Sequence, residues 1–269
     1  MRAFNNFAGV ERLLVRAGIR RRIPAFLHVP KTGGTYLAQN ETNHRPIIRP
    51  MKYIGHYFVV ASLDMPRPVF PPAGFRPTFV VEKRALEPYF VFTTVRNPYS
   101  FLVSYLWHAG GLNPKYNNPD HYDYANARRG FDYLIKTIAN RDAPWPSRKF
   151  IHAQIFCDDG DLIVDWVNNT ERLDDDLARM AAHLRLDYRQ QPPQRVGRED
   201  DYRSYYNDEL CELVKNIWGR ELALFGYDSD GLLESPGVLR GEISTEQKAT
   251  IHYSWAQNLL AAPEGISNL

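Results

Sequence analysis

A lysine, two glycines and two threonines stand together directly after an apolar run. The run extends from Ile23 to Val29, Pro30 ends it, and apolar residues resume at Tyr36, which predicts a strand, a tight loop and the start of a helix. Backbone N–H groups at a helix N-terminus favour an anion, and glycines let the backbone approach it closely. The sequence therefore predicts a phosphate-binding loop formed by Lys31, Thr32, Gly33, Gly34 and Thr35.

This loop differs from the one that binds nucleoside triphosphates. In that motif, G-x-x-x-x-G-K-[ST], the lysine follows the last glycine, and a Mg²⁺-binding hydroxyl follows the lysine. Here Lys31 precedes both glycines. The simpler alternative for the same residues is a glycine turn between a strand and a helix, with Lys31 in solvent.

A second strand and helix carry another cation and another hydroxyl. Residues Tyr89 to Val95 are nearly all apolar or β-branched, which is typical of a parallel strand buried on both faces. Arg96 follows this strand, and Pro98 suits the first turn of a helix on which Ser104 stands eight residues after Arg96. Ligands of open α/β sheets bind at the carboxyl ends of the strands, and arginine suits phosphate oxygens. Arg96 and Ser104 are therefore candidates to bind one phosphate, the alternative being a strand-end arginine and a buried serine.

Both segments resemble the nucleotide-binding signatures of sulfotransferases that use 3'-phosphoadenosine 5'-phosphosulfate (PAPS). The likeness is greatest to the branch that sulfates carbohydrates, which includes the heparan sulfate 2-O-sulfotransferases. It implies that residues Lys31 to Tyr36 bind the 5'-phosphosulfate and that Arg96 and Ser104 bind the 3'-phosphate. The resemblance covers residues 23–228, because residues 169–176 and 225–227 also look like packing features of that family.

Sulfuryl transfer needs a base for the acceptor and a cation for the charge that grows on the bridging oxygen. Lys31 is the candidate for the cation, and His56 is the candidate for the base because histidine titrates near neutral pH. Gly55 and His56 also resemble the element that carries the base in uronosyl 2-O-sulfotransferases, although Ile54 replaces a second histidine found there. The alternatives are a glutamate base, Glu41 or Glu82, and a packed or surface role for His56.

Other polar residues near these motifs receive weaker assignments. Arg195 and Arg198 lie in a basic turn that either closes over the nucleotide or is a solvated linker. His28 is expected to be a strand residue beside the loop rather than a catalyst. No metal is expected, because the loop lacks the Mg²⁺-binding arrangement and a sulfonate carries less charge than a phosphoryl group.

The composition limits the class of protein. With 44% hydrophobic residues, 269 residues suffice for one large core and one domain, and a net charge of +2 is too small for a general nucleic-acid binder. The basic run from Arg16 to Arg22 is expected to be a solvated face. Cys157 and Cys211 are far apart and lack metal-ligand spacing, so they indicate neither a disulfide framework nor a zinc site. A reducing compartment is therefore expected. Without an apolar run of membrane-spanning length, the expectation is a soluble cytoplasmic protein, or a Golgi-lumen protein that has lost its anchor.

Strands alternating with helices predict an α/β fold, which we expect to be P-loop-like and three-layered, with a central, mainly parallel sheet flanked by helices. The expected organisation is a basic amphipathic segment (1–22), a catalytic domain (23–240) and a C-terminal extension (241–269) with a helix around 251–260. Within the domain, we expect strands at 23–29, 75–81, 89–95 and 162–167, a loop at 110–130, and helices from Pro98, at 131–139 and at 174–186. A later helix is expected to be capped by Asp200 or Asp201.

These observations predict a PAPS-dependent sulfotransferase that makes a sulfate ester on a hydroxylated, most plausibly carbohydrate, acceptor. Glycolipid, small phenol and peptide tyrosine are the next acceptors in order. The alternatives are a nucleotide kinase and a protein that binds PAP, the desulfated product, without catalysing transfer.

Overall fold

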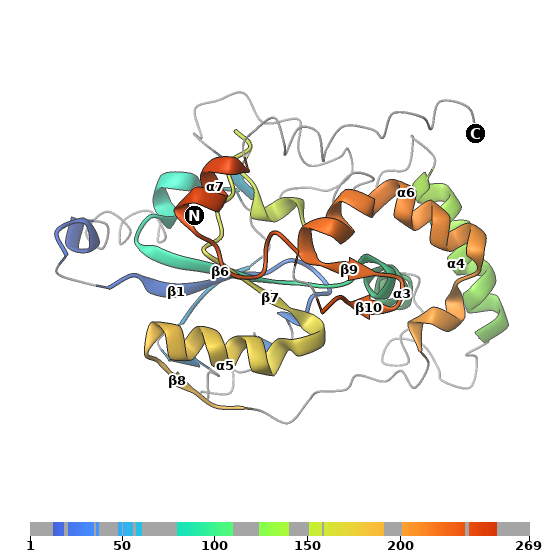
Figure 1. Ribbon diagram of the computed structural model, residues 1–269, viewed down its shortest axis with the longest axis horizontal. Coiled ribbons are helices and arrows are strands. Elements are labelled where there is room, and N and C mark those ends of the chain that lie inside the picture. The colour runs from blue at the N-terminus through green and yellow to red at the C-terminus, as the bar shows by residue number, and fades with distance from the viewer. Residues whose placement is uncertain are drawn as a thin grey trace. The chain divides into compact units, whose positions relative to one another are not determined.

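A strand buried on both faces lies inside the main sheet. In the computed structural model this strand, β6 (Tyr89–Val95), pairs in parallel with β1 (Ile23–Leu27) on one side and with β7 (Trp166–Asn169) on the other (Figure 1). All residues of β6 are buried. The apolar and β-branched composition of this strand follows from that burial, because neither face meets water.

The main sheet has five strands in the order β11-β7-β6-β1-β3. β3 (Lys52–Gly55) continues the parallel arrangement beside β1, whereas β11 (Gly241–Glu242) is antiparallel to β7 at the other edge. Two helices flank the sheet: in Figure 1, α5 (Leu173–Leu184) lies below the strands and α7 (Thr245–Thr250) above them. The prediction of a mixed α/β fold with a mostly parallel central sheet is confirmed.

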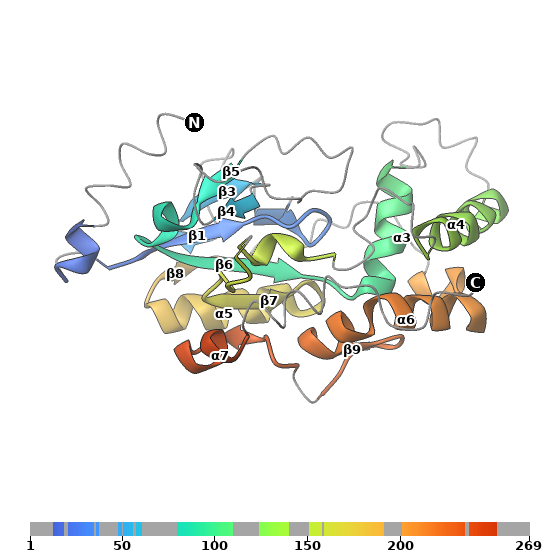
Figure 2. The same cartoon turned by 90° about the horizontal axis from the view of Figure 1, so that it is seen from above.

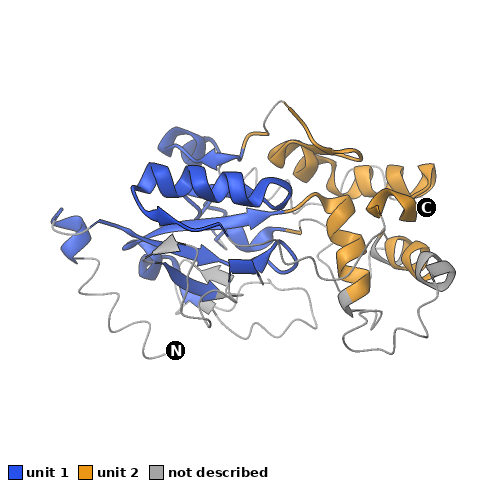
Figure 3. Ribbon diagram, turned by 90° about the horizontal axis from the view of Figure 1, so that it is seen from below, with its two compact units in different colours: residues 1–95, 152–192, 239–258 blue, residues 96–151, 193–238, 259–269 orange. Residues whose placement is uncertain are grey.

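The structure describes residues 13–18, 21–34, 36–37, 48–49, 51–55, 58–60, 80–109, 124–139, 151–157, 159–190, 201–234 and 237–251. The chain forms two compact units. Unit 1 comprises residues 1–95, 152–192 and 239–258, and unit 2 comprises residues 96–151, 193–238 and 259–269 (Figure 3). Unit 1 contains the main sheet, to which β11 and α7 contribute from beyond residue 240.

The core of unit 1 lies between the sheet and α5. Phe26, Phe92 and Trp166 come from the strands, and Leu177 and Met180 from the buried stripe of α5. Burial of each such side chain contributes about 1.5–3 kcal/mol to folding. Figure 2 shows β1 and β3 on one side of β6 and β7 on the other, beside α5.

Short elements complete unit 1. β2 (Ile48–Arg49) is antiparallel to β8 (Asp187–Tyr188), and β4 (Phe58–Val60) is parallel to β5 (Val80–Glu82). The 3₁₀ helices of this unit are η1 (Lys83–Leu86), η3 (Ala153–Ile155) and η4 (Thr170–Arg172).

Unit 2 contains helices and a short hairpin. Its elements are α3 (Pro98–Ala109), α4 (Tyr124–Ala139), η5 (Tyr202–Tyr205), α6 (Asp208–Phe225), β9 (Tyr227–Asp228) and β10 (Gly231–Leu232). Phe131 meets Tyr205 and Tyr206 edge-on, with ring centroids 5.7 and 4.9 Å away. The Tyr206 hydroxyl donates to the carbonyl of Tyr99 (2.8 Å), so this aromatic cluster joins α4 to the start of α3.

Three local predictions were wrong. α4 begins at Tyr124, inside the segment predicted to be a loop. Only residues 166 and 167 of the strand predicted at 162–167 belong to β7, because the backbone at 161–163 bonds to residues 155–157 instead of joining the sheet. The cap of α6 is Asn207, whose side chain accepts from the N–H of Leu210 (2.9 Å), and Asp201 instead caps η5.

Other predictions agree with the structure or fall outside it. The strand predicted at 23–29 is present but ends at residue 27, and the strand at 89–95 and the helix from Pro98 are confirmed. Most of the strand predicted at 75–81 and of the helix predicted at 251–260 lie outside the described residues. Within the described ranges, no helix has both the length and the apolar character needed to cross a membrane.

Asp176 provides a test of what holds β7 to α5. Its buried carboxylate accepts from the backbone N–H of Asn169 (2.8 Å) and from Arg179 (2.5 Å). We expect Asp176→Ala to lower the free energy of unfolding by about 2–3 kcal/mol, because a buried N–H loses its acceptor. The neighbouring Asp175 is exposed, so Asp175→Ala should cost less than about 1 kcal/mol. Urea denaturation measures both, and equal losses would contradict the assignment.

Candidate functional site

The strand order of unit 1 marks one edge of the sheet as the place where open α/β sheets usually bind ligands. Along the chain, β1 leads to β3, which pairs on one side of β1. β6 pairs on the other side of β1 and leads to β7, which lies still farther in that direction. Where two neighbouring parallel strands send their connections in opposite directions, a crevice opens at their carboxyl ends. Here that edge carries the loop that follows Leu27 and the end of β6 at Val95.

The loop after β1 has an unusual backbone. Lys31 and Gly33 both have positive φ, 65° and 87°. A side chain at Gly33 would also meet Leu173 of α5 at 3.0 Å, so only glycine fits there without rearrangement. Residues 34, 36 and 37 are helical, and the N–H of Tyr36 donates to the carbonyl of Gly33 (2.9 Å). The predicted strand, tight loop and helix start are therefore confirmed.

Buried hydroxyls fix this loop to β6. Thr32 is fully buried, and its hydroxyl donates to the carbonyl of Val29 (2.8 Å) and lies 2.9 Å from the hydroxyl of Thr94. The Thr94 hydroxyl also approaches the carbonyl of Thr32 at 2.5 Å. The side chain of Thr32, predicted to bind a ligand, thus points into the protein, where it holds the loop on the neighbouring strand.

The imidazole ring of His28 packs against the loop at Gly34. A methyl group added to Gly34 would lie 1.6 Å from Nε2 of His28, so the imidazole ring sits against the Gly34 backbone. The other ring nitrogen, Nδ1, is hydrogen-bonded to the Tyr53 hydroxyl of β3, and the ring stacks on Phe26 (centroids 5.5 Å apart). His28 follows β1 rather than belonging to it, and its sequence neighbours gave no sign of this contact.

Two tyrosines, Tyr36 of the helix after the loop and Tyr188 of β8, bind one carboxylate of α5. The hydroxyls of Tyr36 and Tyr188 both donate to one oxygen of Asp174, at 2.7 and 2.8 Å. Burial, followed by the contact with Asp174, raises the pKa of Tyr188 above its usual value, so this phenol stays protonated and donates throughout the physiological range. Tyr36, predicted to bind the nucleotide, thus has its hydroxyl directed at α5.

Arg96 and its partners lie in unit 2. The guanidinium Nε of Arg96 donates to the Ser100 hydroxyl (2.7 Å). Ser104 stands one helical turn beyond Ser100, so both serines occupy one face of α3. Asn97 holds this start of α3: its side chain accepts from the N–H of Tyr99 (3.0 Å) and donates to the carbonyl of Asp228 (2.7 Å). The structure thus adds Ser100 to the predicted pair.

Several predicted residues have no described position. His56, Thr35, Arg195, Arg198 and the alternative base Glu41 all lie outside the described residues. Glu82, the other alternative base, is buried and forms an ion pair with Arg84 (2.5 Å). Among the described residues, no group of three or more histidine, cysteine or acidic side chains is arranged to hold a metal ion.

Comparison with family models, curated proteins and solved structures finds no match for this chain. Its function must therefore be inferred from the arrangement of its own residues. The described candidate residues form two separate sets: the loop of residues 28–34 at the carboxyl edge of the sheet in unit 1, and, within unit 2, Arg96 with the face of α3 that carries Ser100 and Ser104.

The contact between Gly34 and His28 can be tested by a double-mutant cycle. Gly34→Ala should lower the free energy of unfolding by about 1–3 kcal/mol, because its methyl group overlaps the imidazole ring. In a His28→Ala background the same change should cost at least about 1 kcal/mol less, because the ring is gone. Gly219→Ala is the control, since nothing lies within 4 Å of its added methyl group. Additive costs of the Gly34 and His28 changes would show that the ring and the loop do not interact.

Proposed function

We propose that this chain is a PAPS-dependent sulfotransferase with a P-loop-like, three-layer fold. The observation that carries the proposal is the place of the Lys31–Gly34 loop, at the carboxyl edge where the connections of β1 and β6 diverge. The loop combines a lysine, a glycine that no other residue can replace without rearrangement and a helix start. These are the parts that a phosphate-binding loop requires.

In this proposal the two motifs bind the two ends of the donor. The loop binds the 5'-phosphosulfate, while Arg96, Ser100 and Ser104 bind the 3'-phosphate. The hydrogen bond between Arg96 and Ser100 supports the second assignment, because it directs the guanidinium along the face of α3 that also carries Ser104. Arg195 and Arg198 are proposed to close over the nucleotide.

The reaction exchanges one S–O bond for another. The acceptor hydroxyl oxygen attacks sulfur, the bond from sulfur to the bridging phosphate oxygen breaks, and the acceptor proton passes to a base, for which we propose His56. The ammonium of Lys31 stabilises the negative charge that the bridging oxygen gains as PAP leaves. A carbohydrate hydroxyl is the proposed acceptor.

Two other functions make different demands. A nucleotide kinase would bind ATP with Mg²⁺, but Lys31 precedes the glycines rather than following them. A protein that binds PAP without catalysis would share every binding residue and transfer nothing to any acceptor.

Calorimetry distinguishes the sulfotransferase from the kinase. We expect PAP to bind without Mg²⁺ and ADP, which lacks the 3'-phosphate, to bind at least about 10-fold more weakly, since hydrogen bonds to charged groups contribute about 1.5–3 kcal/mol. Binding of ATP that requires Mg²⁺, with no binding of PAP, would overturn the proposal in favour of a kinase. Transfer of labelled sulfate from PAPS to a panel of polysaccharides then separates an enzyme from an inactive binder.

Lys31→Ala tests the catalytic cation. We expect turnover to fall by at least about 100-fold, the usual loss when one donor to a developing charge is removed, while PAP still binds. Lys215→Ala, an exposed lysine of α6, is the matched control for loss of one positive charge and should leave turnover unchanged. Wild-type turnover in Lys31→Ala would remove Lys31 from the mechanism.

Arg96→Ala and Ser104→Ala test the 3'-phosphate site. Each should weaken PAP binding, by about 10-fold or more for Arg96, because a charge-assisted hydrogen bond is lost. Binding of ADP should hardly change, since it has no 3'-phosphate. If both ligands weaken equally, or PAP binding is unaltered in calorimetry, these residues do not bind the 3'-phosphate.

A further inference from the structure

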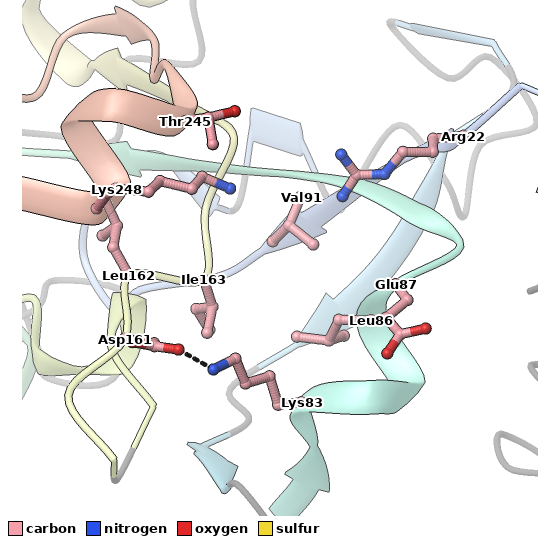
Figure 4. Close-up of a pocket in the computed structure, with 11 residues that line it drawn as sticks. Arg22, Lys83, Leu86, Glu87, Val91, Asp161, Leu162, Ile163, Thr245 and Lys248 are labelled. Atoms are coloured by element: carbon pink, nitrogen blue, oxygen red, sulfur yellow. Dashed lines mark hydrogen bonds and ion pairs between the residues drawn. The ribbon is translucent and has the colours of Figure 1, made fainter. Parts of the chain in front are cut away.

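A cavity of about 420 Å³ lies in unit 1 (Figure 4). Because Arg22 precedes β1 and Val91 is near the start of β6, the cavity is near the opposite ends of these strands from the loop of residues 28–34. Its walls come from β6, from η1 and α7, and from the residues that precede β1, β6 and β7. They are Arg22, Lys83, Leu86, Glu87, Val91, Asp161, Leu162, Ile163, Thr245, Lys248 and Ala249. This volume is within the range of about 300–1,000 Å³ that small-molecule sites usually have.

The inner walls are largely apolar. Leu86 and Val91 come from η1 and β6, and Leu162 and Ile163 from the segment before β7. All four side chains are buried, so the cavity offers hydrophobic contact to a ligand that enters. Ala249 of α7 also lines the cavity but is exposed, so it lies where the cavity meets solvent, and its side chain is a single methyl group.

One wall carries an excess of positive charge. Arg22 and Lys248 point toward one another across Val91 in Figure 4, and both form ion pairs with Asp165, at 2.7 and 2.5 Å. The carboxylate of Asp165 is nearly buried and also accepts from the N–H of Val91 (2.8 Å). Two cations share one carboxylate, so this cluster has a net charge of +1.

The remaining charged groups at the cavity add no positive charge: Lys83 with its two carboxylate partners has a net charge of −1, and Glu87 with its arginine partner is neutral. Lys83 forms ion pairs with Asp161 and with Asp159 (3.2 Å), and Glu87 forms one with Arg16 (2.6 Å). Burial alone would lower the pKa of Lys83, but its bonds to Asp161 and Asp159 raise that pKa overall, so the lysine stays charged and paired. The excess positive charge is therefore confined to the part of the cavity at Arg22 and Lys248, whereas the part at Lys83 has an excess of negative charge.

We propose that this cavity is a second binding site, for a small carboxylate with an apolar body. The carboxylate would bind between Arg22 and Lys248, each of which keeps N–H donors beyond the one used on Asp165. The apolar body would lie against Leu86, Val91 and Ile163. Arg22 belongs to the basic run predicted to be a solvated face, so the proposal gives one member of that run a specific task.

Calorimetry with the full chain at neutral pH tests the ligand class. Octanoate should bind at least 10-fold more tightly than octylamine, octan-1-ol or acetate, because only octanoate combines the negative charge with the apolar body. Equal binding of the three eight-carbon ligands would overturn the proposal. So would the absence of octanoate binding up to about 10 mM, because a specific site should bind more tightly than that.

Two variants locate the octanoate site by different means. Ala249→Phe fills the cavity and leaves every charge in place, and Lys248→Met removes one cation. Each should weaken octanoate binding at least 10-fold, whereas Lys215→Met on α6 should leave it unchanged. Wild-type affinity in both cavity variants would show that octanoate binds elsewhere. PAP binding should be unchanged in Ala249→Phe, so this test succeeds or fails independently of the proposed sulfotransferase activity.

Discussion

The buried hydrogen bonds between Thr32 and Thr94 are the interaction on which the loop of residues 28–34 depends. They join the loop that follows β1 to the end of β6, and both threonines are fully buried. A buried hydroxyl without a partner would cost about 1–3 kcal/mol, so moving the loop away from β6 would be unfavourable. The loop is therefore held by the sheet itself, and its backbone does not need a ligand to keep its shape.

The surrounding groups act on the same few residues. His28 presses on Gly34 from the side of β3, and Leu173 of α5 lies where a side chain at Gly33 would stand. Each of the two glycines thus has a neighbouring side chain where its own side chain would stand. Sites held in this way can bind without first paying the conformational entropy of ordering a loop.

The sequence predicts best where one local cause dominates. β6 was predicted to the residue because burial on both faces leaves a continuous apolar run, and Pro98 marked the start of α3 for steric reasons. Asn207 was missed as a helix cap because Asp200 and Asp201 are equally good caps by type, and the choice depends on tertiary packing. His28 could not be assigned its contact, since only the folded sheet brings its ring to Gly34 and Tyr53.

The left-handed backbone of Lys31 bears on which residues this position can accept in evolution. This conformation costs an L-residue on the order of 1 kcal/mol and costs glycine almost nothing. A chain selected for stability alone would have a glycine or asparagine here, as it has a glycine two residues later. In the proposed sulfotransferase the charge of Lys31 is needed in spite of this strain, so replacement by glycine should give a protein that is more stable but transfers sulfate less well.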